Sequence, residues 1–197
     1  SHTNPRLNKQ TVNRPVFDVF KLDDIFNNGN AEDQFKCGQM LYDGNGVDTY
    51  GYLINQDYAK ALNWFHRAAD QHHPEAQYKL GQMYANGLGT EKNVDRALAW
   101  YLAAAGQDHA KAQYEIGNMH FNGRGVEKDL SKALKFYEKA AAQGLPEAQY
   151  RLGNMYYLGD GVEKDSSKAF NCFSMAAAQN HILSTFLLLS LIHISEP

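Results

Sequence analysis

Histidine is the residue type in this chain with the widest range of chemistry, because it can ligate metals and move protons near neutral pH. Three histidines occupy one recurring position, just ahead of a new sequence unit: His73, His109 and His181. Equivalent residues of stacked helical units lie on the order of 10 Å apart, whereas the ligands of one zinc ion lie about 2 Å from it. The column therefore predicts packing of loops, and neither a metal site nor a cofactor is expected. A fourth histidine, His120, replaces a tyrosine of two other units and is predicted to be half-buried with its polar atoms satisfied.

Pairs of glycines and runs of acids also recur along the chain. The Gly-x-Gly pairs begin at Gly44, Gly87, Gly123 and Gly159. In a phosphate-binding loop such glycines follow a strand and open a helix, but here they follow stretches with helical spacing. The acids of the "VEKD" segment recur between units, whereas a catalytic dyad belongs to one place. We therefore expect no catalytic residues, helix ends at the glycines and helix caps at the acids.

The composition is that of an ordinary folded protein and disfavours some classes of partner. Of the 197 residues, 44% are hydrophobic and 21% charged, and the net charge is -3 with both signs interspersed. Such a chain is not expected to bind nucleic acid. Cys37 and Cys172 have neither disulfide-framework nor metal-site spacing and are predicted to be small core residues. No signal peptide follows Ser1, but without an initial Met a cytoplasmic, periplasmic or secreted location stays open.

Self-similarity with a period of 36 residues explains these recurrences. Four units cover residues 31–73, 74–109, 110–145 and 146–181, and the first unit carries seven extra residues. Each unit predicts two helices: the first contains a packing glycine and ends at the Gly-x-Gly, and the second opens at an Asp or Asn and carries an aromatic pair with two alanines. One helix pair cannot bury such a face alone, so the units must stack into an all-α solenoid.

The repeated pattern "A-x-Y-x-L-G-x-M-Y-x-x-G-x-G-V-x-K-D" resembles the Sel-one-like repeat (SLR), a relative of the tetratricopeptide repeat. The resemblance implies a right-handed α-α superhelix of four helix-turn-helix repeats, acting as a non-enzymatic adaptor or scaffold for a protein or peptide. Cysteine-rich members have been linked to penicillin binding and hydrolysis, so a cell-wall or beta-lactam hydrolysing enzyme is the alternative. Those members staple each helix pair with a disulfide, for which this chain lacks the cysteines.

The candidate binding surface follows from the same resemblance, which implies that the first helix of each pair lines a concave face. Amides there can donate to and accept from a peptide backbone, and aromatic rings supply contact area. An alternative is that the tyrosines are partly buried and the amides only solvate the surface. The expected partner-binding residues, including two from the insertion, are Phe35, Gln39, Tyr42, Tyr50, Tyr52, Tyr78, Gln82, Asn86, Tyr114, Asn118, Phe121, Asn122, Tyr150, Asn154 and Tyr157.

The insertion and the N-terminal segment form a second region of interest. The inserted residues lie within 48–54 and are unusually apolar for a loop, so they are expected either to contact a partner or to fold back over the N-terminal segment 1–30. That segment contains "VFDVFKLDDIF", which predicts a degenerate helix capping the first unit.

The C-terminal apolar run is too short for a membrane anchor, since a spanning helix needs about 20 mostly apolar residues. Residues 182–188 fit the start of a fifth repeat, but residue 189 is leucine where the register calls for glycine. The last nine residues, "LSLIHISEP", resemble a translated sequencing adaptor. Residues 189–197 are therefore expected to be read-through from a chain that naturally continues, with a genuine apolar cap as the alternative. Repeat number and oligomeric state stay open.

Overall fold

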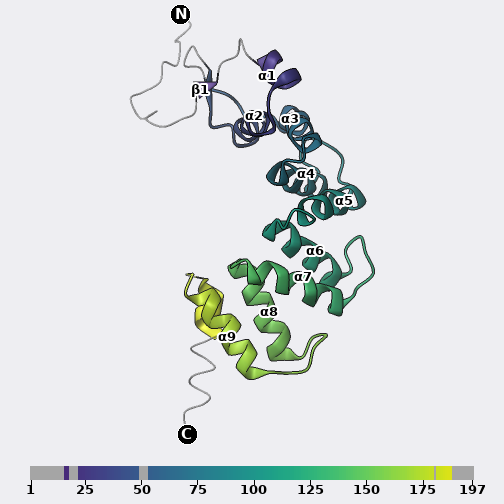
Figure 1. Cartoon of the computed structure of the whole chain (residues 1–197), viewed down its shortest axis with the longest axis vertical. Coiled ribbons are helices and arrows are strands. Elements are labelled where there is room, and N and C mark those ends of the chain that lie inside the picture. Colours follow the sequence, from purple (N-terminus) through teal and green to yellow (C-terminus); the bar gives the residue numbers. More distant parts are fainter. Residues whose placement is uncertain (1–15, 18–21, 49–52, 180, 188–197) are drawn as a thin grey trace, which may run out of the picture. The chain divides into compact units, whose positions relative to one another are not determined.

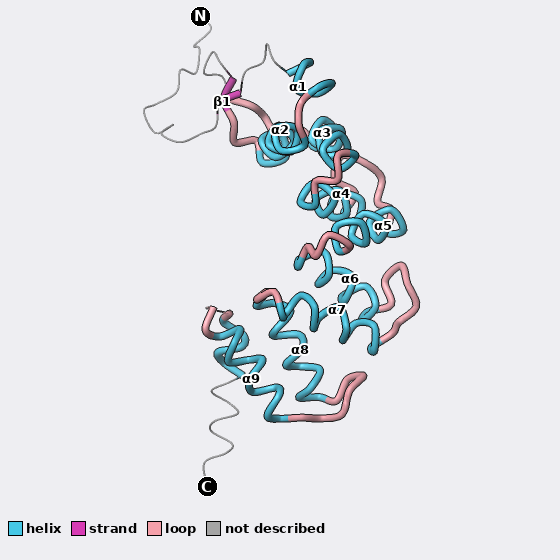
Figure 2. The backbone as a smooth tube through the Cα atoms, in the orientation of Figure 1, coloured by secondary structure: helices cyan, strands magenta, loops and turns pink. Residues whose placement is uncertain are grey.

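The computed structural model describes residues 16–17, 22–48, 53–179 and 181–187 (Figure 1). These residues form helices and loops apart from two strands of two residues each (Figure 2). The chain divides into two compact units, residues 1–93 and 94–197. The expected all-α class of consecutive packed helix pairs is confirmed within each unit.

The first unit holds α1 (Leu22–Asn28), α2 (Ala31–Asp43), α3 (Tyr58–Asp70) and α4 (Pro74–Asn86). Its N-terminal part differs from the single helix predicted for residues 16–26. Strand β1 (Val16–Phe17) pairs in parallel with β2 (Val47–Asp48), and helix begins only at Leu22. The backbone of residues 16–17 therefore makes its hydrogen bonds with the segment that leads into the insertion, which a local helical pattern cannot reveal.

Helix α1 nevertheless covers the first repeat. The ring of Phe26 lies edge-on to Trp64 of α3 with centroids 4.9 Å apart, and the guanidinium of Arg67 lies 4.6 Å from the centroid of the Phe26 ring. Ile25 and Phe26 pack against the buried cluster that contains Cys37 and Trp64. These contacts tie the helix to the α2–α3 pair.

The second unit holds α5 (Val94–Ala105), α6 (Ala110–Asn122), α7 (Leu130–Ala142), α8 (Pro146–Leu158) and α9 (Ser166–Ala177). Within it α6 packs on α7, α7 on α8 and α8 on α9. Ala140 and Ala141 of α7 share a buried cluster with Ala148 and Leu152 of α8. Small residues on both sides let neighbouring repeats approach closely.

The helix ends follow the predicted local chemistry. A side-chain oxygen of Asp57, Asp129 or Asp165 accepts a hydrogen bond of 2.9 Å from the backbone N–H three residues later, at the start of α3, α7 and α9 respectively. Lys60, Lys132 and Lys168 pair with the same carboxylates at 3.2, 3.4 and 3.6 Å. The first helices end at glycines with φ between 63° and 80°, a conformation that only glycine adopts cheaply: Gly44, Gly87, Gly123 and Gly159.

A glycine-on-ring contact joins the two helices of a repeat. A Cβ atom added to Gly117 would lie 2.6 Å from the Tyr137 ring, and one added to Gly153 would lie 2.6 Å from the Phe173 ring. Both rings are fully buried. The predicted packing glycine therefore sets how closely the first helix approaches the second.

Candidate functional site

The candidate surface in the first unit is built from α2 and α4, and much of it is also structural. Phe35 is half-buried, and its ring stacks on His73 with centroids 4.6 Å apart. Tyr42 is half-buried beneath the ammonium of Lys79, which lies 4.9 Å from its ring centroid. The Nε2 of Gln39 donates to Asp43 at 2.7 Å. These aromatic rings are therefore partly engaged in packing within the chain itself.

The predicted binding residues of helix α4 are likewise divided between internal packing and the surface. Tyr78 is only 7% exposed, and its hydroxyl accepts a hydrogen bond of 2.8 Å from Nε2 of Gln82. Asn86 is exposed and donates to the backbone carbonyl of Gln82 at 2.9 Å. Tyr78 thus belongs to the core, while Gln82 and Asn86 remain at the surface with their donors oriented along the helix.

In the second unit α6 carries the corresponding residues. Tyr114 and Phe121 are half-buried, with ring centroids 5.8 and 6.4 Å from that of Tyr137 on α7. Asn118 is half-buried and accepts a hydrogen bond of 2.8 Å from the Tyr137 hydroxyl. Asn122 is exposed and donates to the carbonyl of Asn118. The hydroxyl of a fully buried tyrosine therefore reaches the predicted surface.

Helix α8 presents the next set. Tyr150 is half-buried between Phe173 and His181, with centroid distances of 6.0 and 4.9 Å. Asn154 is half-buried, and Tyr157 and Leu158 at the end of the helix are 39% and 55% exposed. The surface at this end of the repeat is thus more apolar and more open than its equivalent on α6.

Two charged residues on these helices escaped the sequence reasoning. Glu115 on α6 accepts a hydrogen bond of 3.4 Å from Nδ2 of Asn118. Burial lowers the pKa of Arg151 on α8, but its interactions with tyrosine phenols, chiefly that of Tyr114, outweigh this and the pKa is raised. Burial raises the pKa of Glu115, opposed by the Asn118 hydrogen bond and by the charge of Arg124. Burial also raises the pKa of Tyr137, so its hydroxyl keeps its proton and can donate. The sequence contained a signal for these two residues, because Glu115 and Arg151 occupy equivalent repeat positions with opposite charge.

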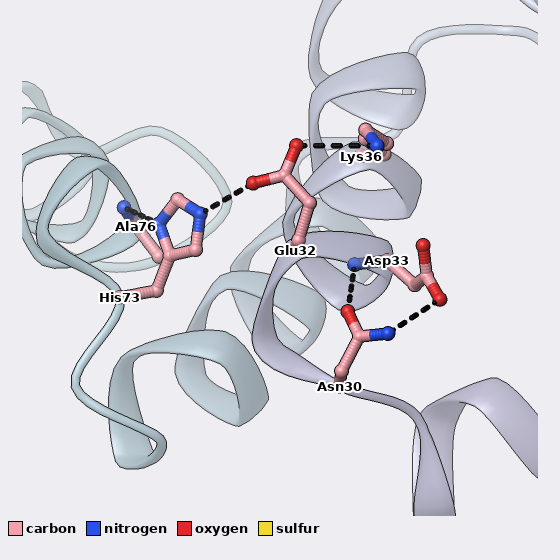
Figure 3. Close-up of polar contacts among 6 residues, drawn as sticks. All are labelled: Asn30, Glu32, Asp33, Lys36, His73 and Ala76. Carbon is pink, nitrogen blue, oxygen red and sulfur yellow. Dashed lines mark hydrogen bonds and ion pairs between the residues drawn. The ribbon is translucent and has the colours of Figure 1, made fainter.

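The histidine column caps helices. Nδ1 of His73 accepts from the backbone N–H of Ala76 at 3.2 Å, and its Nε2 contacts Glu32 Oε2 at 3.1 Å (Figure 3). The hydrogen bond with His73 and the pair with Lys36 lower the pKa of Glu32. Nδ1 of His109 accepts from the backbone N–H of Ala112 at the start of α6, and Nδ1 of His181 accepts from that of Ser184 in the C-terminal helical segment. Leu145, at the same position before α8, makes no side-chain cap. The predicted loop packing is thus a specific capping role.

The other residues with potential chemistry are structural in the described part of the chain. No group of three or more His, Cys, Asp or Glu side chains there is arranged to hold a metal ion. Cys37 is buried and Cys172 half-buried, and both are free thiols. Burial raises the pKa of Cys37 to about 12 and also raises that of Cys172, which disfavours the reactive thiolate.

One prediction for a histidine was wrong in part. His120 is half-buried as expected, and its ring stacks on Phe136 with centroids 6.1 Å apart. Its Nδ1, however, is buried without a hydrogen-bond partner among the described residues. The tyrosines at the equivalent positions place a hydroxyl farther from the backbone, a reach that the shorter imidazole lacks.

A set of buried glutamines was also missed. In three repeats a glutamine at the end of the second helix donates to a buried glutamine of the first, at 2.8, 2.8 and 3.1 Å: Gln71 to Gln34, Gln143 to Gln113 and Gln179 to Gln149. Two recurring glutamines were the available signal: the Gln of "AQY", which is "DQF" in the first repeat, and the Gln that follows the paired alanines. These pairs close one end of each helix pair.

The insertion is only partly described. Val47 bridges to Leu53, and Ile54 is half-buried against the cluster that contains Met40. Tyr50 and Tyr52 lie outside the described residues. Asp48, the first residue of the insertion, pairs with Phe17 of the N-terminal segment. Whether the inserted tyrosines contact that segment or a partner stays a prediction.

The C-terminal segment follows the repeat register for a few residues. Residues 182–187 are helical, and Ser184 is buried where the second, third and fourth repeats have alanine. The proposed adaptor residues 189–197 lie outside the described residues. Within the described chain, no helix combines the length and apolar character needed to cross a membrane.

Proteins of known structure are similar to this chain. A Sel1 repeat protein from Oxalobacter formigenes is 30% identical with a TM-score of 0.76, over 86% of this chain and 66% of that one. A protective antigen of uropathogenic Escherichia coli strains that displays an SLR fold is 33% identical with a TM-score of 0.76, over 84% of this chain and 34% of that one.

Sequence relatives match shorter stretches. The ERAD-associated E3 ubiquitin-protein ligase component HRD3A of Arabidopsis thaliana is 38% identical over 61 residues, which are 31% of this chain and 8% of that protein. The chain spans less than a tenth of the length of the curated relatives it matches. The Sel1 repeat itself matches residues 31–73, 74–109, 110–145 and 146–181. The chain belongs to the Sel1 repeat family.

Proposed function

We propose that this chain is a non-enzymatic scaffold that binds a peptide or protein partner on the faces of its first helices. The Sel1 repeat is a scaffold for protein interactions, and one relative is by name a component of an E3 ubiquitin-protein ligase. In the first unit the partner surface comprises the exposed and half-buried amides and aromatic rings of α2 and α4, and in the second unit those of α6 and α8. Tyr50 and Tyr52 of the insertion belong to the proposal as a second contact surface.

The repetition of amide side chains at equivalent surface positions supports this proposal most directly. Gln82 in the first unit and Asn118 and Asn154 in the second are half-buried, which leaves part of each amide open to a partner. A primary amide both donates and accepts, as does a peptide backbone. Tyr150 and Tyr157 add rings beside Asn154 that are not fully buried, and tyrosine supplies contact area at a small entropic cost.

A peptide selection tests the proposal. Random peptides displayed on phage are selected against the purified chain, and the affinity of a selected synthetic peptide is then measured by fluorescence anisotropy. Gln82→Ala and Asn118→Ala are each expected to weaken binding about fivefold, the effect of one hydrogen bond. Lys135→Ala, at an exposed position of α7, is the matched control and is expected to bind like the original chain.

The outcomes separate binding from folding. Circular dichroism establishes that each variant retains its helices and its melting transition. The proposal fails if no peptide is selected, or if both amide variants bind the selected peptides as tightly as Lys135→Ala does. A third variant, Tyr52→Ser, examines the insertion, where an unchanged affinity removes that surface from the proposal.

A further inference from the structure

Asn118 differs from the other amides of the candidate surface because neighbours engage both ends of its side chain. Its Oδ1 accepts a hydrogen bond of 2.8 Å from the Tyr137 hydroxyl, and its Nδ2 donates to Glu115 Oε2 at 3.4 Å. Tyr137 comes from α7 and Glu115 from one turn earlier on α6. The amide is therefore held between a buried phenol and a carboxylate.

These two partners decide which way the amide points. A carboxylate only accepts hydrogen bonds, so the nitrogen end of Asn118 must lie on the side of Glu115. The oxygen end then faces the phenol, which donates to it. The fully buried Tyr137 ring cannot swing away, because its edge lies against Gly117. An amide that could flip by half a turn elsewhere has one orientation here.

The fixed orientation decides which end of the amide carries the free donor. An amide nitrogen carries two hydrogens; one is directed to Glu115 and the other remains available on a half-buried side chain. The oxygen accepts from the hydroxyl of the fully buried Tyr137 and keeps its second lone pair at that end of the amide. The free hydrogen on the nitrogen is therefore the donor that Asn118 can offer, and its complement on a peptide is a backbone carbonyl.

We propose that Tyr137 and Glu115 are positioning residues that hold Asn118 as an oriented hydrogen-bond donor to a backbone carbonyl of a bound peptide. This inference rests on the proposed function and deepens it. Neither positioning residue needs to touch the peptide. Their contribution is to remove the amide's flipping freedom before binding, so that less entropy is lost in the complex.

The fourth repeat provides an internal comparison. One repeat length further on, Phe173 stands in place of Tyr137, Arg151 in place of Glu115 and Asn154 in place of Asn118. Phenylalanine has no hydroxyl to donate, and arginine only donates. Asn154 therefore lacks the pair of neighbours that fixes Asn118, and its amide can present either end.

The first test measures the orientation of the amide in the free protein. The two side-chain N–H signals of Asn118 are expected in nuclear magnetic resonance spectra as a well-separated pair whose exchange with water is slower than that of Asn154. Tyr137→Phe and Glu115→Gln should each bring the Asn118 exchange rate toward that of Asn154. Glutamine at position 115 both donates and accepts, so it removes the constraint while keeping nearly the same size.

The second test measures affinity for the phage-selected peptide. Asn118→Asp, which replaces the donor with an acceptor, is expected to weaken binding about tenfold or more, whereas Asn154→Asp should change it less. Tyr137→Phe and Glu115→Gln should each weaken binding about threefold. Glu115 is half-buried, whereas Tyr137 is fully buried, so the Glu115→Gln variant keeps the test informative if Tyr137→Phe unfolds the repeat.

The results distinguish the inference from the function on which it rests. Peptides that bind the chain but are insensitive to Asn118→Asp would overturn the donor role. Sensitivity to Asn118→Asp with unchanged affinity and amide exchange in both Tyr137→Phe and Glu115→Gln would overturn the positioning role. A chain that selects no peptide at all would instead remove the proposed function.

Discussion

The third and fourth repeats share a register and a core but differ around that core. Gly117 lies against Tyr137 in one and Gly153 against Phe173 in the other, and a Cβ atom added to either glycine would lie 2.6 Å from the ring. The third repeat adds a hydroxyl that reaches Asn118 and a histidine that caps its first helix. The fourth has neither, since Leu145 precedes α8 without a side-chain cap.

This difference separates what the fold requires from what a given repeat can vary. The glycine, the ring and the small residues recur because they determine the distance between helices. The cap and the ring hydroxyl vary because the packing survives without them. Leu145 packs against the buried cluster that contains Ala148 and Leu152, so apolar burial takes the place of a hydrogen bond at the start of α8.

The largest effect is expected where the two repeats agree. Gly117→Ala and Gly153→Ala each place a methyl group 2.6 Å from a buried ring, and overpacking of this kind costs about 2 kcal/mol. The free energy of unfolding in urea measures it. Gly106→Ala is the control, because a Cβ there would meet its nearest atom at 3.4 Å. If the two core variants were as stable as this control, the glycine-on-ring contact would not set the helix spacing.

A smaller effect is expected where the repeats disagree. His109→Ala removes the acceptor that caps α6 and is expected to lower the free energy of unfolding by about 1 kcal/mol, while His109→Asn should recover most of it. At the other joint, Leu145→Asn adds a capping acceptor but removes an apolar contact. It should therefore be no more stable than the original chain. A clear gain in stability for Leu145→Asn would show that leucine does not compensate for the missing cap.

The smallest effect concerns the loss of stability at acidic pH. The hydrogen bonds from the backbone N–H groups of Lys132 and Lys168 lower the pKa of Asp129 and Asp165 from the ordinary value of 3.8. Groups with a lowered folded pKa stabilise the fold above their unfolded pKa, and this contribution is lost as the pH falls through the folded value. Asp129→Asn and Asp165→Asn keep a capping acceptor that does not titrate. Both should flatten the fall of melting temperature between about pH 5 and about pH 2.

Asp129→Asn and Asp165→Asn should weaken the pH dependence of the melting temperature to a similar extent. The capping distances are 2.9 Å at both aspartates, and both carboxylates pair with a lysine in the first turn. If only one of the two variants weakened the dependence of the melting temperature on acidic pH, neighbouring groups, and not the shared cap, would govern the titration.

Local sequence was sufficient for much of the fold. The glycines that end the first helices were predictable because a left-handed residue after a helix strongly favours glycine. The aspartate caps were predictable because they act within three residues. The strand at Val16–Phe17 was not predictable in this way, because its partner lies 31 residues further along the chain.

The candidate surface shows the same division. Sequence reasoning identified the amide and aromatic positions from the repeat register, but it treated the members of each column as alike. It left partial burial of the tyrosines open without distinguishing Tyr78 from the others, and it did not foresee that Asn118 is held by Tyr137. Burial depends on the residues contributed by the second helix, so equivalent positions acquire different environments.

The sequence by itself determined the repeat, its helix boundaries and its family, because these depend on glycine conformation, short-range caps and a period that is visible in one chain. Only the tertiary structure decided which side chains on the first helices are structural and which are open, and which end of the Asn118 amide is engaged. Those properties arise from contacts between helices, where a single hydroxyl on a buried ring changes what a neighbouring surface residue can offer to a partner.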